Sequence, residues 1–212
     1  MAIDELLDEH EQGERVRGWL RENGGGLLTG VLLGLALILG WQWWQQQRAH
    51  GRLQAGNDYQ AALDALSAGK ADVAAARVAA LPAGSAYATL GTLALAKSQA
   101  DAGKRDQAIA TLRALKSDDP ELAGVVRNRL AQLLLDAGKP KDAIATLGEA
   151  KDAPLAAAIR GDAYVALGQL PEARTAYGQA LAGLPVGSPL RNLVELKLID
   201  AGGTAPDVEA RS

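Results

Sequence analysis

The most constraining feature of this sequence is the stretch from Asn23 to Gln47, which contains no ionisable residue. Its central part, residues 24–44, reads GGGLLTGVLLGLALILGWQWW. An α-helix rises 1.5 Å per residue, so about 20 residues are enough to cross a hydrocarbon core about 30 Å thick. A core helix of a globular domain rarely lacks a polar stripe over such a length. The sequence therefore predicts one transmembrane helix at residues 24–44, surrounded by a lipid bilayer.

Tryptophan residues lie near the two ends of this predicted span. The chain has 4 of them, and none lies in the long segment that follows the span. Indole rings combine an apolar body with one N–H donor and favour the headgroup layer of a bilayer. Chance clustering in a buried helix is the alternative interpretation. We predict the following membrane-interface anchors: Trp19, Trp41, Trp43 and Trp44.

The flanks of the span indicate an uncleaved anchor with its N-terminus in the cytoplasm. A cleavable signal peptide starts with a basic region and ends with small residues. Here residues 1–22 carry 7 acidic and 3 basic side chains, and bulky Trp and Gln residues end the span. Three arginines precede the span and two closely follow it, which slightly favours a cytoplasmic start. We predict an acidic cytoplasmic tail at residues 1–23 and a juxtamembrane linker helix at residues 45–58.

Glycines recur at every fourth residue within the span, at Gly26, Gly30 and Gly34. That spacing places three positions without side chains on one helix face, where a second helix can approach closely. These three residues are the predicted transmembrane packing face. The alternative is that the glycines are incidental, because glycine is common in membrane helices.

The segment at residues 59–200 is rich in Ala and Leu, shows helix-period apolar spacing and lacks strand signals, which predicts an all-α domain. It contains an internal repeat, since four related turns are spaced 34, 35 and 30 residues apart. Each turn has a glycine where a helix would end and an acidic residue in the first turn of the next helix. We interpret these acids as structural. The four turns are SAGKADVA, DAGKRDQA, DAGKPKDA and ALGQLPEA, ending at Ala74, Ala108, Ala143 and Ala173.

A capping helix is predicted after the last repeat, started by Ser188 and Pro189 and containing Leu190, Leu193, Val194 and Lys197. Beyond it we predict a flexible C-terminal tail at residues 201–212. The resulting domain is a stack of helical hairpins, in which each hairpin covers the apolar face of its neighbour.

The spacing of small residues, large residues and prolines in these hairpins resembles the tetratricopeptide repeat. One unit matches through Ala96, Ala108, Leu112 and Pro120, and the last through Gly161, Tyr164, Ala173, Tyr177, Ala180 and Pro185. The resemblance implies an α-helical hairpin superhelix whose first helices line a groove for polypeptides. The family's groove positions correspond here to Tyr59, Leu90, Leu93, Lys97, Asp101, Val125, Asn128, Gln132, Leu155 and Asp162. Many of the leucines have the alternative role of packing between hairpins.

Catalytic and cofactor signals are missing from the sequence. The chain has no cysteine and 2 histidines, His10 and His50, which lie on opposite sides of the predicted span. No phosphate-binding loop, nucleophile elbow or zinc-binding helix motif is present. Asp118 and Asp119 could bind a cation, but two adjacent acids more often solvate a loop. Residues 48–212 carry 19 basic and 18 acidic side chains, so they lack a footprint for nucleic acid. We predict a non-enzymatic protein without a metal, a cofactor or bound nucleic acid.

The whole layout resembles the YfgM-type ancillary subunits of the SecYEG translocon. The acidic start AIDELLDEHEQGERVRGWLREN, the glycine-rich span, WQWWQQQR and the hairpins all match. The resemblance implies a single-pass protein of the cell inner membrane with a periplasmic repeat domain. Its implied partners are the SecYEG translocon, a PpiD-like periplasmic chaperone and exported polypeptides, with a possible Rcs-type response regulator on the cytoplasmic side.

Two other functions stay open at this point. The first is an inner-membrane repeat protein that binds apocytochrome segments during cytochrome c maturation. Such a protein would bind peptides that carry haem-attachment motifs. The second is an enzyme with an unfamiliar active site, which would release product from envelope substrates.

Overall fold

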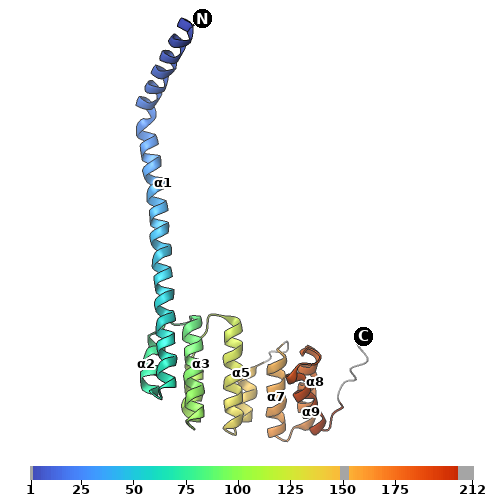
Figure 1. The fold of residues 1–212 in the computed structure, drawn as a ribbon. Helices are drawn as coiled ribbons and strands as arrows, with labels where there is room; N and C mark the ends of the chain where they lie inside the picture. The colour runs from blue at the N-terminus through green and yellow to red at the C-terminus, as the bar shows by residue number, and fades with distance from the viewer. Residues whose placement is uncertain (1, 149–152, 205–212) are drawn as a thin grey trace. The chain divides into compact units, whose positions relative to one another are not determined.

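The computed structural model describes residues 2–148 and 153–204, which are helical almost throughout (Figure 1). Within these residues the only β-type pairing is an isolated bridge between Gly84 and Ser117. The predicted all-α class is therefore confirmed. The helices are α1 (Ala2–Ser67), α2 (Ala71–Ala80), α3 (Ala86–Asp101), α4 (Arg105–Ala114), α5 (Pro120–Asp136), α6 (Pro140–Leu147), α7 (Pro154–Ala166), α8 (Leu170–Gly183) and α9 (Pro189–Asp200).

The chain divides into two compact units, the first ending at Gln54 and the second beginning at Ala55. Helix α1 contributes to both. In the part of the chain that the structure describes, α1 is the one helix long and apolar enough to cross a membrane. Its large apolar side chains from Leu28 to Leu39 are exposed within the first unit. The predicted tail, span and linker end at residues 23, 44 and 58, and α1 continues through all three positions without a break. The division into these three segments therefore stays a prediction.

Each repeat turn ends a helix on a glycine with a positive φ. Gly69, Gly103, Gly138 and Gly168 have φ between 68° and 77°. At Gly103 the backbone N–H donates to the Ala100 carbonyl and the next N–H, of Lys104, donates to the Gln99 carbonyl. This pattern satisfies carbonyls that the end of a helix leaves unpaired, and a side chain would strain the glycine position. The predicted helix ends are confirmed.

Helices α3–α8 form three hairpins, α3/α4, α5/α6 and α7/α8 (Figure 1). Their first helices contact one another in the order α3, α5, α7, and each second helix contacts the first helix of the next hairpin. Small residues make this close packing possible: Ala108, Ala131, Ala143 and Ala163 are fully buried in one apolar core. The last part of α1 begins the stack, because Ala55 packs with residues of the α2–α3 region.

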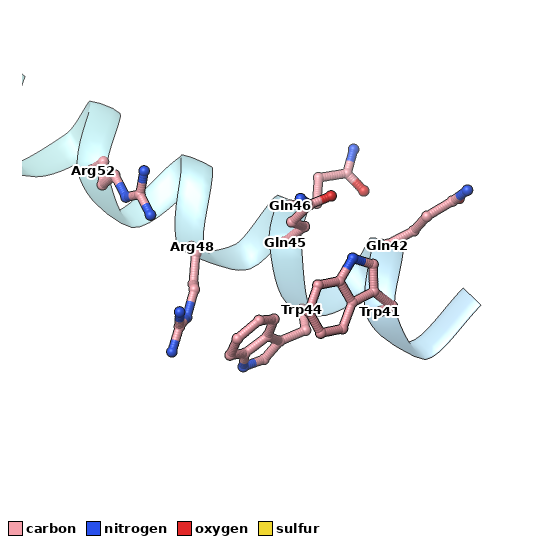
Figure 2. Close-up of a pocket in the computed structure, with 7 residues that line it drawn as sticks. All are labelled: Trp41, Gln42, Trp44, Gln45, Gln46, Arg48 and Arg52. Carbon is pink, nitrogen blue, oxygen red and sulfur yellow. The ribbon is translucent and has the colours of Figure 1, made fainter. Parts of the chain in front are cut away.

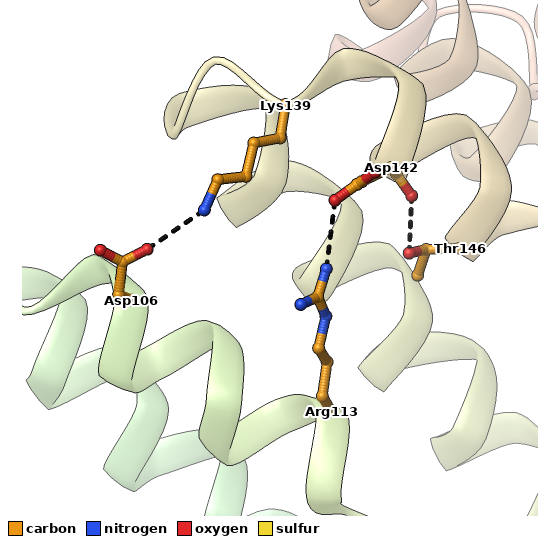
Figure 3. Close-up of polar contacts among 5 residues, drawn as sticks. All are labelled: Asp106, Arg113, Lys139, Asp142 and Thr146. Atoms are coloured by element: carbon orange, nitrogen blue, oxygen red, sulfur yellow. Dashed lines mark hydrogen bonds and ion pairs between the residues drawn. The ribbon is translucent and has the colours of Figure 1, made fainter.

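The predicted structural acids lie in the first turns of α2, α4, α6 and α8, where a negative charge favours the positive end of the helix dipole. Two of them also bridge consecutive hairpins (Figure 3). Asp106 pairs with Lys139 at 3.2 Å, and Asp142 pairs with Arg113 at 3.3 Å. Both pairs are exposed, so each is expected to contribute less than about 1 kcal/mol to stability. The four acids are Asp72, Asp106, Asp142 and Glu172.

Of the adjacent acids Asp118 and Asp119, the second has a structural role in capping a helix. The Asp119 carboxylate accepts hydrogen bonds from the backbone N–H groups of Glu121 and Leu122, at 2.8 and 3.1 Å. It therefore caps α5, whose first residue is Pro120. Among the described residues no group of three or more potential ligands could hold a metal ion.

Helix α9 closes the stack, and Ser188 caps its start as predicted. Ala201, the first residue of the predicted tail, is buried against it, and residues 205–212 lie outside the described part of the chain. Arg191 is the buried cation of this helix. Its guanidinium donates to the carbonyls of Leu181 and Leu184 at the end of α8, at 2.8 and 3.1 Å, and forms an ion pair with Glu195 at 2.8 Å.

Replacing Arg191 with leucine is expected to lower the free energy of unfolding by about 1–3 kcal/mol. The change removes the donors from two carbonyls at a helix end and leaves the Glu195 carboxylate without its cation. Urea unfolding of the full chain in detergent, followed by circular dichroism, measures the loss. Arg127→Leu is the matched control, because Arg127 is exposed and the change should stay within about 0.5 kcal/mol. Equal effects from the two variants would contradict the capping role.

Candidate protein-binding groove

The hollow that best fits a polypeptide lies between α3 and α5, with a volume of about 480 Å³. The floor is apolar and is formed by Leu93, Leu112 and Leu133 with small alanines around them. Val125 projects into the opening and is exposed. This hollow contains five predicted groove residues: Leu93, Lys97, Asp101, Val125 and Gln132.

Charged and polar side chains of both signs form the rim of the groove. Lys97 and Asp101 pair along one side of α3. On α5, the guanidinium of Arg129 donates to the Gln132 side-chain oxygen at 3.2 Å. Asp136 adds a second carboxylate. The rim is therefore balanced in charge, which suits a polypeptide with scattered apolar side chains better than a highly charged tail.

Sequence reasoning missed Arg129 and Asp136 as lining residues. Both follow a predicted groove residue by four positions, Arg129 after Val125 and Asp136 after Gln132. Residues four apart share a helix face. Extending the predicted positions by one helical turn along α5 would have found both.

The other five predicted groove residues do not line this hollow. Tyr59 is half-buried and its ring lies 5.6 Å from that of Tyr87. Leu90 and Leu155 are each 38% exposed, and Asn128 is half-buried. Asp162 is engaged within the domain, because its carboxylate accepts from the Tyr177 hydroxyl at 2.7 Å and from the Lys197 ammonium at 2.8 Å. These five stay predicted contacts.

The predicted membrane elements of α1 present two surfaces. Gly26 and Gly30 line a shallow hollow with Trp19 and Val31. Within the first unit, no atom lies within contact distance of a Cβ built at any of the three predicted packing glycines, Gly26, Gly30 and Gly34. At the other end of the apolar segment the Trp41 and Trp44 rings lie 5.3 Å apart (Figure 2). Trp43 is 65% exposed. Whether these surfaces contact helices or lipid stays a prediction.

Comparison with known families identifies the repeat domain. The sequence model of the tetratricopeptide repeat-like domain family matches residues 17–203. Among solved structures, a variant of the nearly identical TPR-like repeats of a Podosopora anserina kinesin light chain aligns with a TM-score of 0.50. That alignment has 18% sequence identity and covers 71% of this chain and 85% of the other. At this identity the likeness supports the fold alone.

Three curated relatives carry the name ancillary SecYEG translocon subunit. The relative from Escherichia coli (strain K12) is 30% identical over 197 residues, which cover 90% of this chain and 95% of that protein. The relative from Haemophilus influenzae is 27% identical and covers 82% of this chain and 89% of its own length. The relative from Neisseria gonorrhoeae is 36% identical over 112 residues, 50% of this chain and 54% of that protein.

Proposed function

The chain belongs to the family of ancillary SecYEG translocon subunits, and from this premise we propose that it is a membrane-anchored adaptor that holds exported polypeptides beside the translocon. A translocon-associated role at the membrane follows from the family and from the apolar helix α1. The adaptor role rests on one observation: the groove between α3 and α5 combines an apolar floor with a rim of balanced charge.

The topology in this proposal has the N-terminus in the cytoplasm and the repeat domain in the periplasm of the inner membrane. It is supported by the three arginines before the apolar segment and by the absence of a cleavage signal. A polypeptide that leaves the channel unfolded exposes apolar side chains, and the partly buried Leu93 and Leu133 would cover them. In this location a PpiD-like chaperone could receive the same clients, and the acidic segment before the span could contact an Rcs-type regulator.

We propose that this role is binding without catalysis. The groove is lined by aliphatic residues, two cations, two carboxylates and one amide, and its described lining includes no Ser, Thr, Cys or His. The lining therefore lacks a hydroxyl or thiol nucleophile and the imidazole that most often serves as a general base. The ionisable groups on the rim are exposed, and Lys97 and Asp101 neutralise each other.

A photo-crosslinking amino acid at Val125 of the full-length protein in cells tests the adaptor role. Val125 is exposed in the groove, so we expect it to capture translocon subunits, a periplasmic chaperone and newly exported chains. The same crosslinker at Gln107 is the control, since Gln107 is an exposed residue of α4 outside the groove. Capture that is equal at the two positions, or capture at Val125 of none of these partners, would contradict the proposal.

A further inference from the structure

A second surface of the chain has a specific ligand chemistry, at the C-terminal end of the apolar segment of α1. Trp41, Trp44, Arg48 and Arg52 follow one another at spacings of three, four and four residues, which places them on one helix face. Together with Gln45 they line a hollow on the side of the helix (Figure 2). The Arg48 guanidinium carbon lies 3.6 Å from the centre of the Trp44 ring.

These two arginines have no acidic partner in the described part of the chain. No Asp or Glu occurs between Glu22 and Asp58, so carboxylates are absent along this length of the helix. Three surface cations of the repeat domain differ from these arginines, because Lys97, Arg113 and Lys139 each pair with an aspartate. The face therefore carries two uncompensated positive charges next to two exposed aromatic rings. Its charge complements an anion.

The depth of the arginines in a membrane specifies the kind of anion. If Trp44 lies at the edge of the hydrocarbon core, Arg48 is four residues, or about 6 Å, further out, at the level of the headgroups. Arg52 is about 12 Å out, but side chains in an α-helix point back toward its N-terminus, which here is toward the membrane. Both guanidinium groups can therefore reach the layer of lipid phosphates.

The geometry of the Trp44–Arg48 pair also favours phosphate. A guanidinium that stacks on an aromatic face keeps its N–H edges free, and those edges match two oxygens of one phosphate. Stacking on Trp44 also reduces the rotamer freedom that Arg48 loses on binding. Gln45 adds amide donors next to this position for the hydroxyl groups of a headgroup.

We propose that Trp41, Trp44, Arg48 and Arg52 form a binding site for the headgroup of an anionic phospholipid, such as phosphatidylglycerol. A zwitterionic lipid carries an ammonium group beside its phosphate, which offsets the attraction to two arginines. The site selects lipids whose phosphate has no such counter-charge. This proposal rests on the membrane span that the proposed function includes.

The test uses the full-length protein in vesicles of phosphatidylcholine that contain phosphatidylglycerol. Brominated acyl chains on one lipid or the other quench nearby tryptophans, so the ratio of the two quenching curves gives the preference for phosphatidylglycerol. An arginine near an anionic lipid surface strengthens binding about fivefold. We therefore expect R48Q/R52Q, which keeps all four tryptophans that report the quenching, to lose most of the preference.

Two controls separate this site from net charge and from the span. K70Q/R77Q removes two exposed cations of the repeat domain, so it has the same net charge as R48Q/R52Q and should keep the full preference. Flotation of the protein with the vesicles reports the span independently of lipid type. Protein that does not float contradicts both the span and the site, whereas protein that floats but is quenched equally by the two lipids contradicts the site alone.

A free phosphate ion is the competing source of the same chemistry. Added salt screens charges and can lower the quenching ratio by itself, so chloride at the same ionic strength is the reference. Inorganic phosphate should change the ratio no more than chloride does. A specific loss of the preference in phosphate would overturn the assignment to a lipid. Retention of the preference in R48Q/R52Q would overturn it as well.

Discussion

Arginine in place of both Leu33 and Leu35 is expected to release the chain from membranes. Both side chains are exposed near the middle of the apolar segment, so nothing else in the described first unit would compensate the new charges. Each arginine at the centre of a membrane helix costs about 2.5–3.5 kcal/mol for insertion, and each lost leucine removes a smaller favourable contribution. The combined cost is about 6 kcal/mol, which exceeds what a single span of moderate hydropathy can offset.

Alkaline extraction of membranes, followed by detection of the chain in pellet and supernatant, measures this release. L20R/L53R is the matched control, because both leucines are exposed on α1 outside residues 24–44. That variant adds the same two charges and should remain in the pellet. Arginine is a good helix former, so circular dichroism in detergent should be unchanged in either variant. Retention of L33R/L35R in the pellet would show that another part of the chain binds the membrane.

The elements that sequence analysis predicted correctly are set by local physical chemistry. Gly103 ends α3 because only glycine adopts a positive φ without strain, and Asp106 follows it in the first turn of α4 because of the helix dipole. The repeat spacing adds one non-local prediction, that residues about one repeat apart lie on neighbouring hairpins. The Asp106–Lys139 pair, 33 residues apart, follows that rule.

The roles of two side chains in contacts between helices were not predictable in this way. Asp162 has the position of a groove residue in the family pattern, yet its carboxylate binds Lys197 of the capping helix α9, which lies one repeat length further along the chain. Arg191 is a second case, because arginines are usually exposed and nothing in the sequence shows that it contacts the end of α8.

Half of the ten predicted groove residues line the hollow, and the regularity of the repeat explains which ones. Lys97, Val125 and Gln132 lie at regular positions on the first helices of two complete hairpins, and all three line the hollow. Tyr59 and Leu155 lie in flanking repeats, where irregular spacing and the junction with α1 change the surroundings of each position. The hollow is limited to the α3–α5 region, where the repeat is most regular.

Replacing Tyr177 with alanine is expected to lower the free energy of unfolding by about 3–5 kcal/mol. The Tyr177 ring is 2% exposed and packs against Gly161 of α7, where an added Cβ would overlap it. Its hydroxyl donates to Asp162, which also binds Lys197 of α9, so one side chain of α8 connects three helices. Removing a buried aromatic ring of this size leaves a cavity that the surrounding helices fill only partly.

The Tyr177→Phe variant separates the ring from its hydroxyl. It keeps the packing and should cost about 1 kcal/mol, the usual net contribution of one hydrogen bond. Burial and the hydrogen bond to Asp162 raise the pKa of Tyr177 above its ordinary value of 10.0. Because the folded chain holds the proton more tightly, this stabilisation is complete below about pH 10 and decreases as the pH rises above it. The Tyr177→Phe variant has no hydroxyl to titrate, so it should lack this part of the decrease in folding stability at alkaline pH.

A double-mutant cycle with Gly161 tests whether the ring is the source of the effect. Gly161→Ala alone should cost about 1–3 kcal/mol, because the new methyl group overlaps the Tyr177 ring. In the Tyr177→Ala background the ring is absent, so most of that cost should disappear. Urea unfolding of the full chain in detergent gives the four free energies. Additive effects of the two changes would contradict the packing role of Tyr177.

Amide hydrogen exchange locates the loss along the stack. In a repeat protein each hairpin contacts only its neighbours, so destabilisation spreads mainly to adjacent repeats. Tyr177→Ala should therefore lower protection in α7, α8 and α9, which share its core, while α3 and α4 keep theirs. The groove between α3 and α5 would then persist in a chain whose C-terminal helices open. Loss of protection in α3 equal to that in α8 would instead mean that the described hairpins unfold as one cooperative unit, and binding at the groove would depend on the capping helix.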